Sequence, residues 1–159
     1  MLAYLYQPNV DFGEQFSIYE PYEYLSAFLK KSIEKIQFIT RVPKVSEFVK
    51  GVINLRGVVT PIIDLRLRFN FEEKEYSERT RIIIVTFEEK EVGFIVDSAN
   101  DVIDIPSDCV ENAPEVVGEQ EHDYIEGIAK LDKRLLILIN LENVLQMNSE
   151  VDPNVVEVK

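Results

Sequence analysis

Few residues of this chain could do nucleophilic or acid–base chemistry. His122 and Cys109 are the only imidazole and the only thiol among 159 residues. A Ser-His-Asp or Cys-His site could use His122, but no strand–turn–helix elbow or comparable signature accompanies it. We interpret His122 as a solvated histidine in an acidic loop and Cys109 as a structural thiol. We assign no catalytic residue.

Metal and phosphate chemistry is also poorly supported. A structural zinc site needs several cysteines or histidines, and the chain has one of each. A phosphate-cradling loop needs clustered glycines that end in Lys followed by Ser or Thr. Gly51 and Gly57 are instead followed by Val52 and Val58. We expect no metal site and no cofactor.

Carboxylates are abundant, and two of them follow apolar segments. Asp64 comes after Ile62-Ile63, and Asp97 comes after Ile95-Val96. These two acids either cap strand ends, pair with neighbours such as Arg66, or take part in a carboxylate site. A small carboxylate-dependent enzyme therefore stays open as an alternative, although no ligand set favours it.

The net charge of the chain makes some classes of binding partner less probable than others. The net charge of −12 disfavours nucleic acid and anionic membrane surfaces. Residues 30–68 nevertheless carry nine basic and three acidic side chains, a net of +6, which leaves −18 on the rest. This asymmetry indicates either two differently charged docking faces or charges that interleave once the chain folds.

The longest apolar runs, such as 135–139, have the length of a strand and fall far short of the roughly 20 residues that span a bilayer. The N-terminus does not resemble a secretory signal, because no basic segment precedes an apolar one. One cysteine cannot form an internal disulfide. We therefore expect a cytoplasmic protein.

Several segments are typical of strands. β-Branched residues dominate 81–87, and a polar turn at 88–91 separates them from 92–96, which predicts a hairpin. Further strands are predicted at 52–55, 58–65 and 134–141. Pro61 should lie at an edge, a bulge or a strand start, because proline donates no ladder hydrogen bond. Short strands with little helix favour a barrel or sandwich.

Two segments have helical spacing. Pro21 could begin a helix whose apolar positions recur as far as Ile36. Leu141, Val144 and Leu145 predict a short helix near the C-terminus. We expect loops at 72–78 and 114–123, and a frayed tail over 149–159.

One long run is more specific than any of these patterns. Residues 40–69 read TRVPKVSEFVKGVINLRGVVTPIIDLRLRF. This run resembles the signature of the CheW chemotaxis coupling protein family and of the related regulatory domain of the kinase CheA. The resemblance covers about three quarters of the chain and continues in SIEKIQ at 32–37, TRIIIV at 80–85, EVGFIVD at 91–97, NDVI at 100–103, YIEGIAK at 124–130 and RLLI at 134–137.

The resemblance implies a mainly β fold of two small SH3-like β-barrels around a common core, with a short C-terminal helix. Residues 1–159 would then form a single CheW-like domain. It also implies a non-catalytic adaptor that couples the cytoplasmic tips of methyl-accepting chemoreceptors to the regulatory domain of the histidine kinase CheA. Such an adaptor would be cytoplasmic, would be recruited to membrane receptor arrays, and would have no direct membrane contact.

By motif match, five positions are expected to face the receptor, in a groove that the family places between the barrels. They are Gly51, Asn54, Arg56, Ala99 and Val102. Ala99 stands where many members carry a valine. The glycines could instead serve turn geometry alone, and Arg56 could instead form an internal ion pair with Asp64 or Asp97.

The first 31 residues fit the family poorly. Members begin with a strand, a tight turn and a second strand, and residues 12–18 resemble that turn and second strand. Residues 19–31 look too long and too helical. Two alternatives to a chemoreceptor adaptor stay open: an adaptor of another CheA-like pathway and the small carboxylate-dependent enzyme. We do not expect a CheV-like protein, because no receiver domain follows Lys159.

Overall fold

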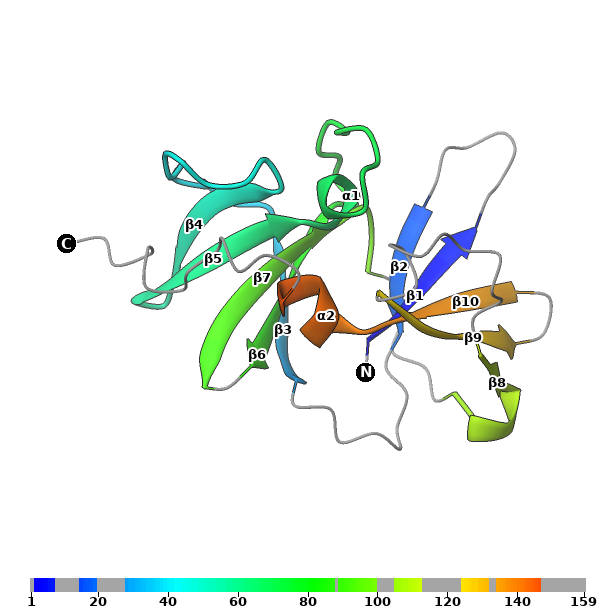
Figure 1. Ribbon diagram of the computed structural model, residues 1–159. Coiled ribbons are helices and arrows are strands. Elements are labelled where there is room, and N and C mark those ends of the chain that lie inside the picture. Colours follow the sequence, from blue (N-terminus) through cyan, green and yellow to red (C-terminus); the bar gives the residue numbers. More distant parts are fainter. Residues whose placement is uncertain are drawn as a thin grey trace. The chain divides into compact units, whose positions relative to one another are not determined.

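The β-branched segments form strands that assemble into two sheets (Figure 1). This computed structural model describes residues 2–7, 15–19, 28–87, 89–99, 105–112, 124–131 and 134–146. The chain divides into two units. Unit 1 comprises Met1–Ser26 and Asp97–Leu145, and unit 2 comprises Ala27–Val96 and Gln146–Lys159.

Unit 1 holds a sheet of five described strands in the order β2-β1-β10-β9-β8. Their bounds are Leu2–Gln7 (β1), Gln15–Tyr19 (β2), Val110–Glu111 (β8), Ile125–Leu131 (β9) and Arg134–Ile139 (β10). Strand β1 pairs antiparallel with both β10 and β2. The N-terminal segment therefore supplies two paired strands, although its sequence matches the family poorly.

Unit 2 holds the second sheet, in the order β3-β6-β7-β5-β4. Its described strands are Phe28–Lys35 (β3), Val49–Leu55 (β4), Val58–Asp64 (β5), Arg81–Phe87 (β6) and Lys90–Val96 (β7). Neighbouring strands run antiparallel except β5 and β7, which pair in parallel over Ile62–Asp64. The predicted mainly β fold is confirmed.

The predicted hairpin at 81–96 is β6 and β7, which pair along their whole length from Arg81↔Val96 to Phe87↔Lys90. Ile82, Ile83, Ile84 and Val85 are all fully buried. Side chains alternate between the two faces of a strand, so β6 is covered on both faces. This explains why its sequence is an unbroken apolar run.

Pro61 lies in the interior strand β5, opposite Val52 of β4. The pairing of β5 with β7 begins one residue later, at Ile62. Pro61 therefore sits where β5 has a ladder on only one side, so its missing donor costs no pairing. The expected edge, bulge or strand start is therefore wrong for Pro61, although its position shares with a sheet edge the missing ladder on one side.

Short helical segments complete the described residues: α1 (Leu65–Arg68), the 3-10 turn η1 (Ser107–Cys109) and α2 (Leu141–Gln146). Helix α2 confirms the C-terminal prediction, and Leu141 and Val144 bury its apolar side. Within the described part of the chain, no helix is long and apolar enough to cross a bilayer.

The helix predicted from Pro21 to Ile36 is wrong over its described part, because Phe28–Lys35 is strand β3, paired with β6. The register of this pairing shifts between Lys30 and Ser32. Such a bulge breaks the period-two pattern by which a strand is recognised, and the apolar residues then fit a helical period by coincidence.

Residues 20–27 lie outside the described residues, as do the loop predicted at 114–123 and the tail after 148. The loop predicted at 72–78 carries no helix or strand.

Candidate partner-binding site

The tip of the β4–β5 hairpin carries Arg56, the candidate residue best suited to contact a partner. Leu55 pairs with Val58, which leaves Arg56 and Gly57 as a two-residue loop. Both have positive φ, 52° for Arg56 and 85° for Gly57. This combination is typical of a type I′ turn, whose twist matches that of the flanking strands. Gly57 takes this conformation easily, whereas Arg56 does so at some cost in backbone energy.

Asn54 fixes the conformation of this turn. Its Oδ1 accepts a hydrogen bond of 2.8 Å from the backbone N–H of Gly57, and its side chain is exposed. An asparagine that bonds a backbone group a few residues ahead stabilises a turn. Asn54 therefore positions Arg56, in addition to any contact of its own with a partner.

Arg56 projects into solvent with 74% of its side chain exposed, and its Nη2 lies 3.7 Å from Oε1 of Glu34 on β3. Glu34 is an acidic partner that the alternative of an internal pair with Asp64 or Asp97 did not name. An exposed pair at this distance contributes about 0–1 kcal/mol to stability. Glu34 can therefore orient the guanidinium while leaving its planar donors accessible to a partner.

Gly51 has a different role, which is to close the sheet of unit 2. Thr40 and Val52 form an isolated antiparallel bridge, with Thr40 N–H donating to Val52 O and Val52 N–H donating to Thr40 O, both at 2.9 Å. A Cβ on Gly51 would lie 2.0 Å from the carbonyl oxygen of Thr40, and the φ of Gly51 is 138°. Only glycine fits there. The close approach expected for Gly51 is a contact inside unit 2.

The interior of this closed sheet is apolar. Its buried cluster comprises Ile53, Leu55, Ile62, Ile82, Ile84 and Ile95, and Ile36 and Ile39 pack against it. The segment after β3 thus continues past Lys35, contributes to the core, and then reaches β4 at the Thr40 bridge. The β4–β5 hairpin is therefore attached to the packed core of unit 2.

The other two candidate positions, Ala99 and Val102, fall in the part of the chain assigned to unit 1. Ala99 belongs to unit 1, at the end of a described segment, and is partly buried. Val102 lies outside the described residues. Gly51, Asn54 and Arg56 all lie on β4 or at its tip, in unit 2.

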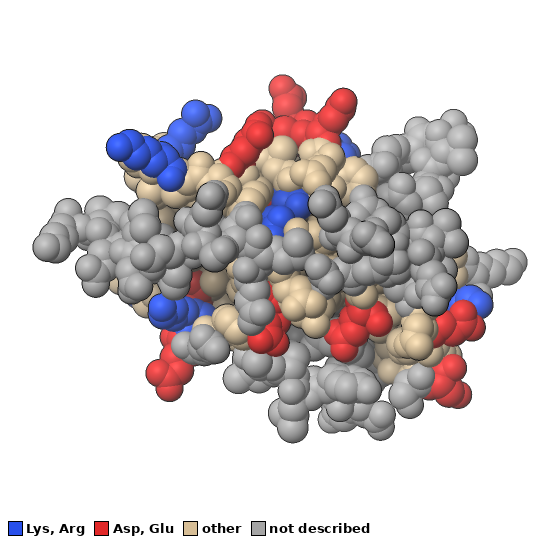
Figure 2. Space-filling view, in the orientation of Figure 1, with Lys and Arg blue, Asp and Glu red and all other residues tan. Residues whose placement is uncertain are grey.

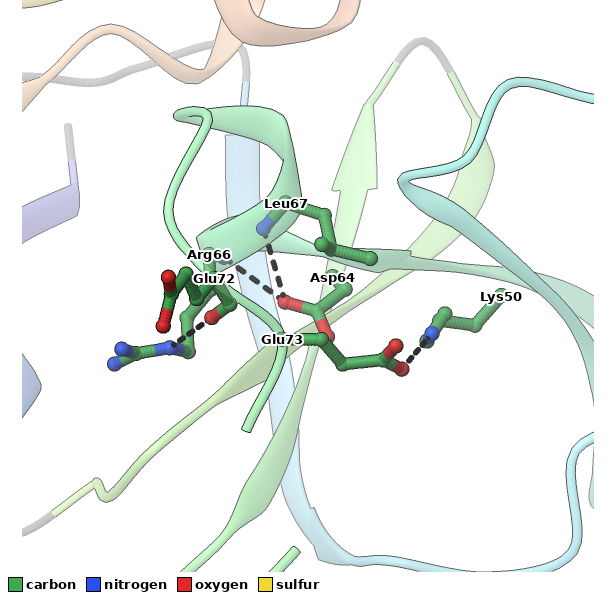
Figure 3. A network of polar contacts seen from close by, with 6 residues as sticks. All are labelled: Lys50, Asp64, Arg66, Leu67, Glu72 and Glu73. Atoms are coloured by element: carbon green, nitrogen blue, oxygen red, sulfur yellow. Dashed lines mark hydrogen bonds and ion pairs between the residues drawn. The ribbon is translucent and has the colours of Figure 1, made fainter. Parts of the chain in front are cut away.

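Asp64 serves as a helix cap. Its Oδ1 accepts hydrogen bonds from the backbone N–H of Arg66 at 2.9 Å and of Leu67 at 3.4 Å, at the start of α1 (Figure 3). Desolvation by burial raises the pKa of Asp64 against the opposing effect of these hydrogen bonds. Asp64 lies at the end of β5, but the element that it caps is helix α1 and not the strand end that one of the alternatives named.

Two further contacts attach the segment after α1, one to the helix itself and one to the sheet. Arg66 Nε donates to the carbonyl oxygen of Glu72 at 3.1 Å, and Lys50 of β4 pairs with Glu73 (Figure 3). Tyr76 lies on the same segment, and burial, followed by the charge of Asp64, raises its pKa to about 12. These polar contacts stabilise the loop at the base of β4.

The described residues offer little catalytic chemistry. Among them no group of three or more His, Cys, Asp or Glu side chains could hold a metal ion. Desolvation, with the neighbouring Asp108, raises the pKa of the Cys109 thiol, which lowers the fraction of this thiol present as the reactive thiolate. His122 lies outside the described residues. The hairpin tip presents a cation, which suits recognition of carboxylates or backbone carbonyls.

Sequence reasoning missed two residues that complete this region, Glu34 and Thr40. Both are far from β4 in sequence and act only through the folded sheet. The strongest available signal was the SIEKIQ segment at 32–37, which contains Glu34 and matched the family without a role for that acid.

Comparison with known proteins agrees with this geometry. The CheW-like domain family matches residues 31–149. Chemotaxis protein CheW of Bacillus subtilis (strain 168) is 52% identical over 119 residues, which cover 75% of this chain and 76% of that protein. Chemotaxis protein CheW of Klebsiella aerogenes is 38% identical over 107 residues, covering 67% of this chain and 64% of that protein.

A solved structure has the same fold. The scaffolding protein TtCheW from Thermoanaerobacter tengcongensis superposes with a TM-score of 0.71 at 30% identity and covers 92% of this chain and 93% of its own. The chain belongs to the CheW-like family. Its function is that of an adaptor in chemotaxis signalling.

Proposed function

We propose that this protein couples chemoreceptors to the regulatory domain of the histidine kinase CheA, without catalysis of its own. The supporting observation is the exposed guanidinium of Arg56 on a turn that Asn54 holds in place. A preorganised donor loses little conformational freedom on binding, so the entropic cost of binding a partner is small. The helical tip of a receptor, with carboxylates and carbonyl ends, is a suitable target for such a donor.

We propose further that both units act as one CheW-like domain, which works in the cytoplasm and is recruited to membrane receptor arrays. The family match spans residues from unit 1 and unit 2. An adaptor needs at least two interaction surfaces, and the basic excess of residues 30–68 against the acidic remainder supports a division of charge between them.

The test is kinase autophosphorylation reconstituted from receptor, CheA and ATP, with and without this protein. We expect strong activation that depends on the protein. If the folded protein gives no activation, receptor coupling to this kinase is refuted, and a partner in another CheA-like pathway becomes the explanation.

A further inference from the structure

Glu34 carries a carboxylate on the core-facing side of strand β3. It pairs with Ile82 of β6, and Ile82 belongs to the buried core cluster of unit 2. Residues that pair directly across two strands have their side chains on the same face. Ile36, two residues further along the chain, packs against the same cluster. The side chain of Glu34 therefore leaves its strand on the side of the core.

Burial makes Glu34 the fixed member of its ion pair with Arg56. The Glu34 side chain is 25% exposed, whereas the Arg56 side chain is 74% exposed. A carboxylate in a core-facing position loses part of its hydration and needs polar partners to offset that loss. The Arg56 guanidinium lies 3.7 Å from Glu34 and supplies one such partner. In return, Glu34 restricts the directions in which the long Arg56 side chain can point.

The ion pair also changes the kind of acceptor that Arg56 binds best. A guanidinium has five N–H donors, so a contact with Glu34 leaves donors for a partner. A partner carboxylate on the same guanidinium would lie close to the Glu34 carboxylate, and these like charges would repel each other more strongly once the partner excludes water. An uncharged carbonyl oxygen meets no such repulsion, and it still accepts a charge-assisted hydrogen bond from the guanidinium.

Carboxylates of a partner have other basic groups to meet on unit 2. Arg41 and Lys44 are exposed on the loop before β4, and Lys35 is exposed at the end of β3. Figure 2 shows basic side chains gathered beside the loops that precede β4. Electrostatic attraction of an acidic partner can therefore come from these residues, while Arg56 supplies a directed hydrogen bond.

We propose that Glu34 is a positioning residue, which holds Arg56 for an uncharged carbonyl oxygen of the partner and selects against a carboxylate at this turn. Glu34 acts through Arg56 and does not itself contact the partner. The inference rests on the proposed function, because it specifies which chemical group of the receptor Arg56 bonds.

The experiment measures binding of the purified cytoplasmic fragment of a chemoreceptor from the same organism to the full chain by fluorescence anisotropy. Glu34→Gln keeps the shape of the side chain and removes its charge, and Arg56→Ala removes the donor. Glu47→Gln, at an exposed acid before β4, is the matched control for the loss of one negative charge. We expect Glu34→Gln to weaken binding about 2- to 10-fold, because Arg56 must then be ordered on binding. Glu47→Gln should bind like the unchanged protein.

Two further readouts separate a positioning role from a structural one. In the presence of Arg56→Ala, Glu34→Gln should cause no additional loss of binding, because Glu34 acts through Arg56. The loss caused by Arg56→Ala alone should be nearly equal at low and high ionic strength, because salt screens a contact with an uncharged oxygen less than a contact between two charges. Thermal unfolding of Glu34→Gln should stay close to that of the unchanged protein, since Arg56 is largely exposed.

The outcomes separate this inference from the proposed function. If Glu34→Gln tightens binding, or if the loss caused by Arg56→Ala disappears in high salt, the acceptor is a carboxylate and the inference is wrong. If Glu34→Gln binds like Glu47→Gln, or weakens binding equally with and without Arg56, Glu34 has no positioning role. The coupling function survives each of these results, because the unchanged chain still binds. If the unchanged chain does not bind the fragment, both proposals fail.

Discussion

Two glycines of one continuous motif, Gly51 on β4 and Gly57 in the turn after β4, have very different surroundings. Gly51 faces the backbone of Thr40 so closely that a Cβ would overlap its carbonyl oxygen, whereas a Cβ on Gly57 would meet nothing within 4 Å. The first glycine allows the sheet of unit 2 to close, and the second allows the hairpin to turn. The motif therefore combines a structural part at its start with a turn at its end, which is the part that we propose faces a partner.

The largest expected effect is the difference in stability loss between alanine substitutions at the two glycines. Gly51→Ala should destabilise the protein by about 3 kcal/mol or more, because the new methyl group forces apart the bridge between Thr40 and Val52. Gly57→Ala should cost only about 1–2 kcal/mol, the cost of a left-handed alanine. Urea unfolding of both variants measures the difference, and equal losses would contradict the division.

Substitutions of Asn54 test whether the Asn54 side chain stabilises the turn. Asn54→Ala removes the hydrogen bond to the Gly57 N–H and should cost about 0.5–1.5 kcal/mol. Asn54→Asp keeps an acceptor oxygen and should retain most of the stability. Thermal unfolding of the pair checks this prediction, which fails if alanine and aspartate behave alike.

The contact between Glu34 and Arg56 should be weak. Because Arg56 is largely exposed, a double-mutant cycle with Glu34→Gln and Arg56→Ala should give a coupling energy of about 0–1 kcal/mol. The coupling should shrink further in high salt. A coupling above about 2 kcal/mol in chemical unfolding would mean that Arg56 is part of the structure, like Gly51.

Asp64 should give the smallest effect, seen in the pH dependence of stability. Burial raises its folded-state pKa above the ordinary value of 3.8, so between these two values the folded protein binds more protons than the unfolded chain. Stability from this group is therefore greatest below pH 3.8 and falls as the pH rises through the raised pKa. Asp64→Asn cannot titrate, so the stability of the unchanged protein relative to this variant should decline over that interval. A constant or opposite trend in unfolding at several pH values would refute the desolvation of Asp64.

The sequence correctly predicted those strands and helices whose residue patterns lie within one short stretch of the chain. The hairpin of β6 and β7 followed from two β-branched runs with a polar turn, and α2 followed from apolar residues at helical spacing. β3 was misread because its bulge between Lys30 and Ser32 disrupts alternation. The sequence carries no sign of a bulge until the partner strand is known.

The receptor-facing role of the candidate site residues stays a prediction from the motif, and the sequence did not predict the contacts that these residues make. The predicted short strand at 52–55, with Arg56 just after its end, is confirmed, because these residues are neighbours in the chain. Glu34 and Thr40 reach this hairpin only through closure of the sheet, which depends on long-range pairing. Ala99 belongs to unit 1, whereas Asn54 and Arg56 belong to unit 2.

The most direct test of the account is receptor-fragment binding by Arg56→Gly, measured together with its thermal unfolding. Glycine adopts the φ of 52° without strain, so this variant should be at least as stable as the unchanged protein. Its binding should nevertheless weaken about 10- to 150-fold, the value of one lost charge-assisted contact. Unchanged binding, or unfolding at a much lower temperature, would contradict the claim that Arg56 is held at the turn for a partner.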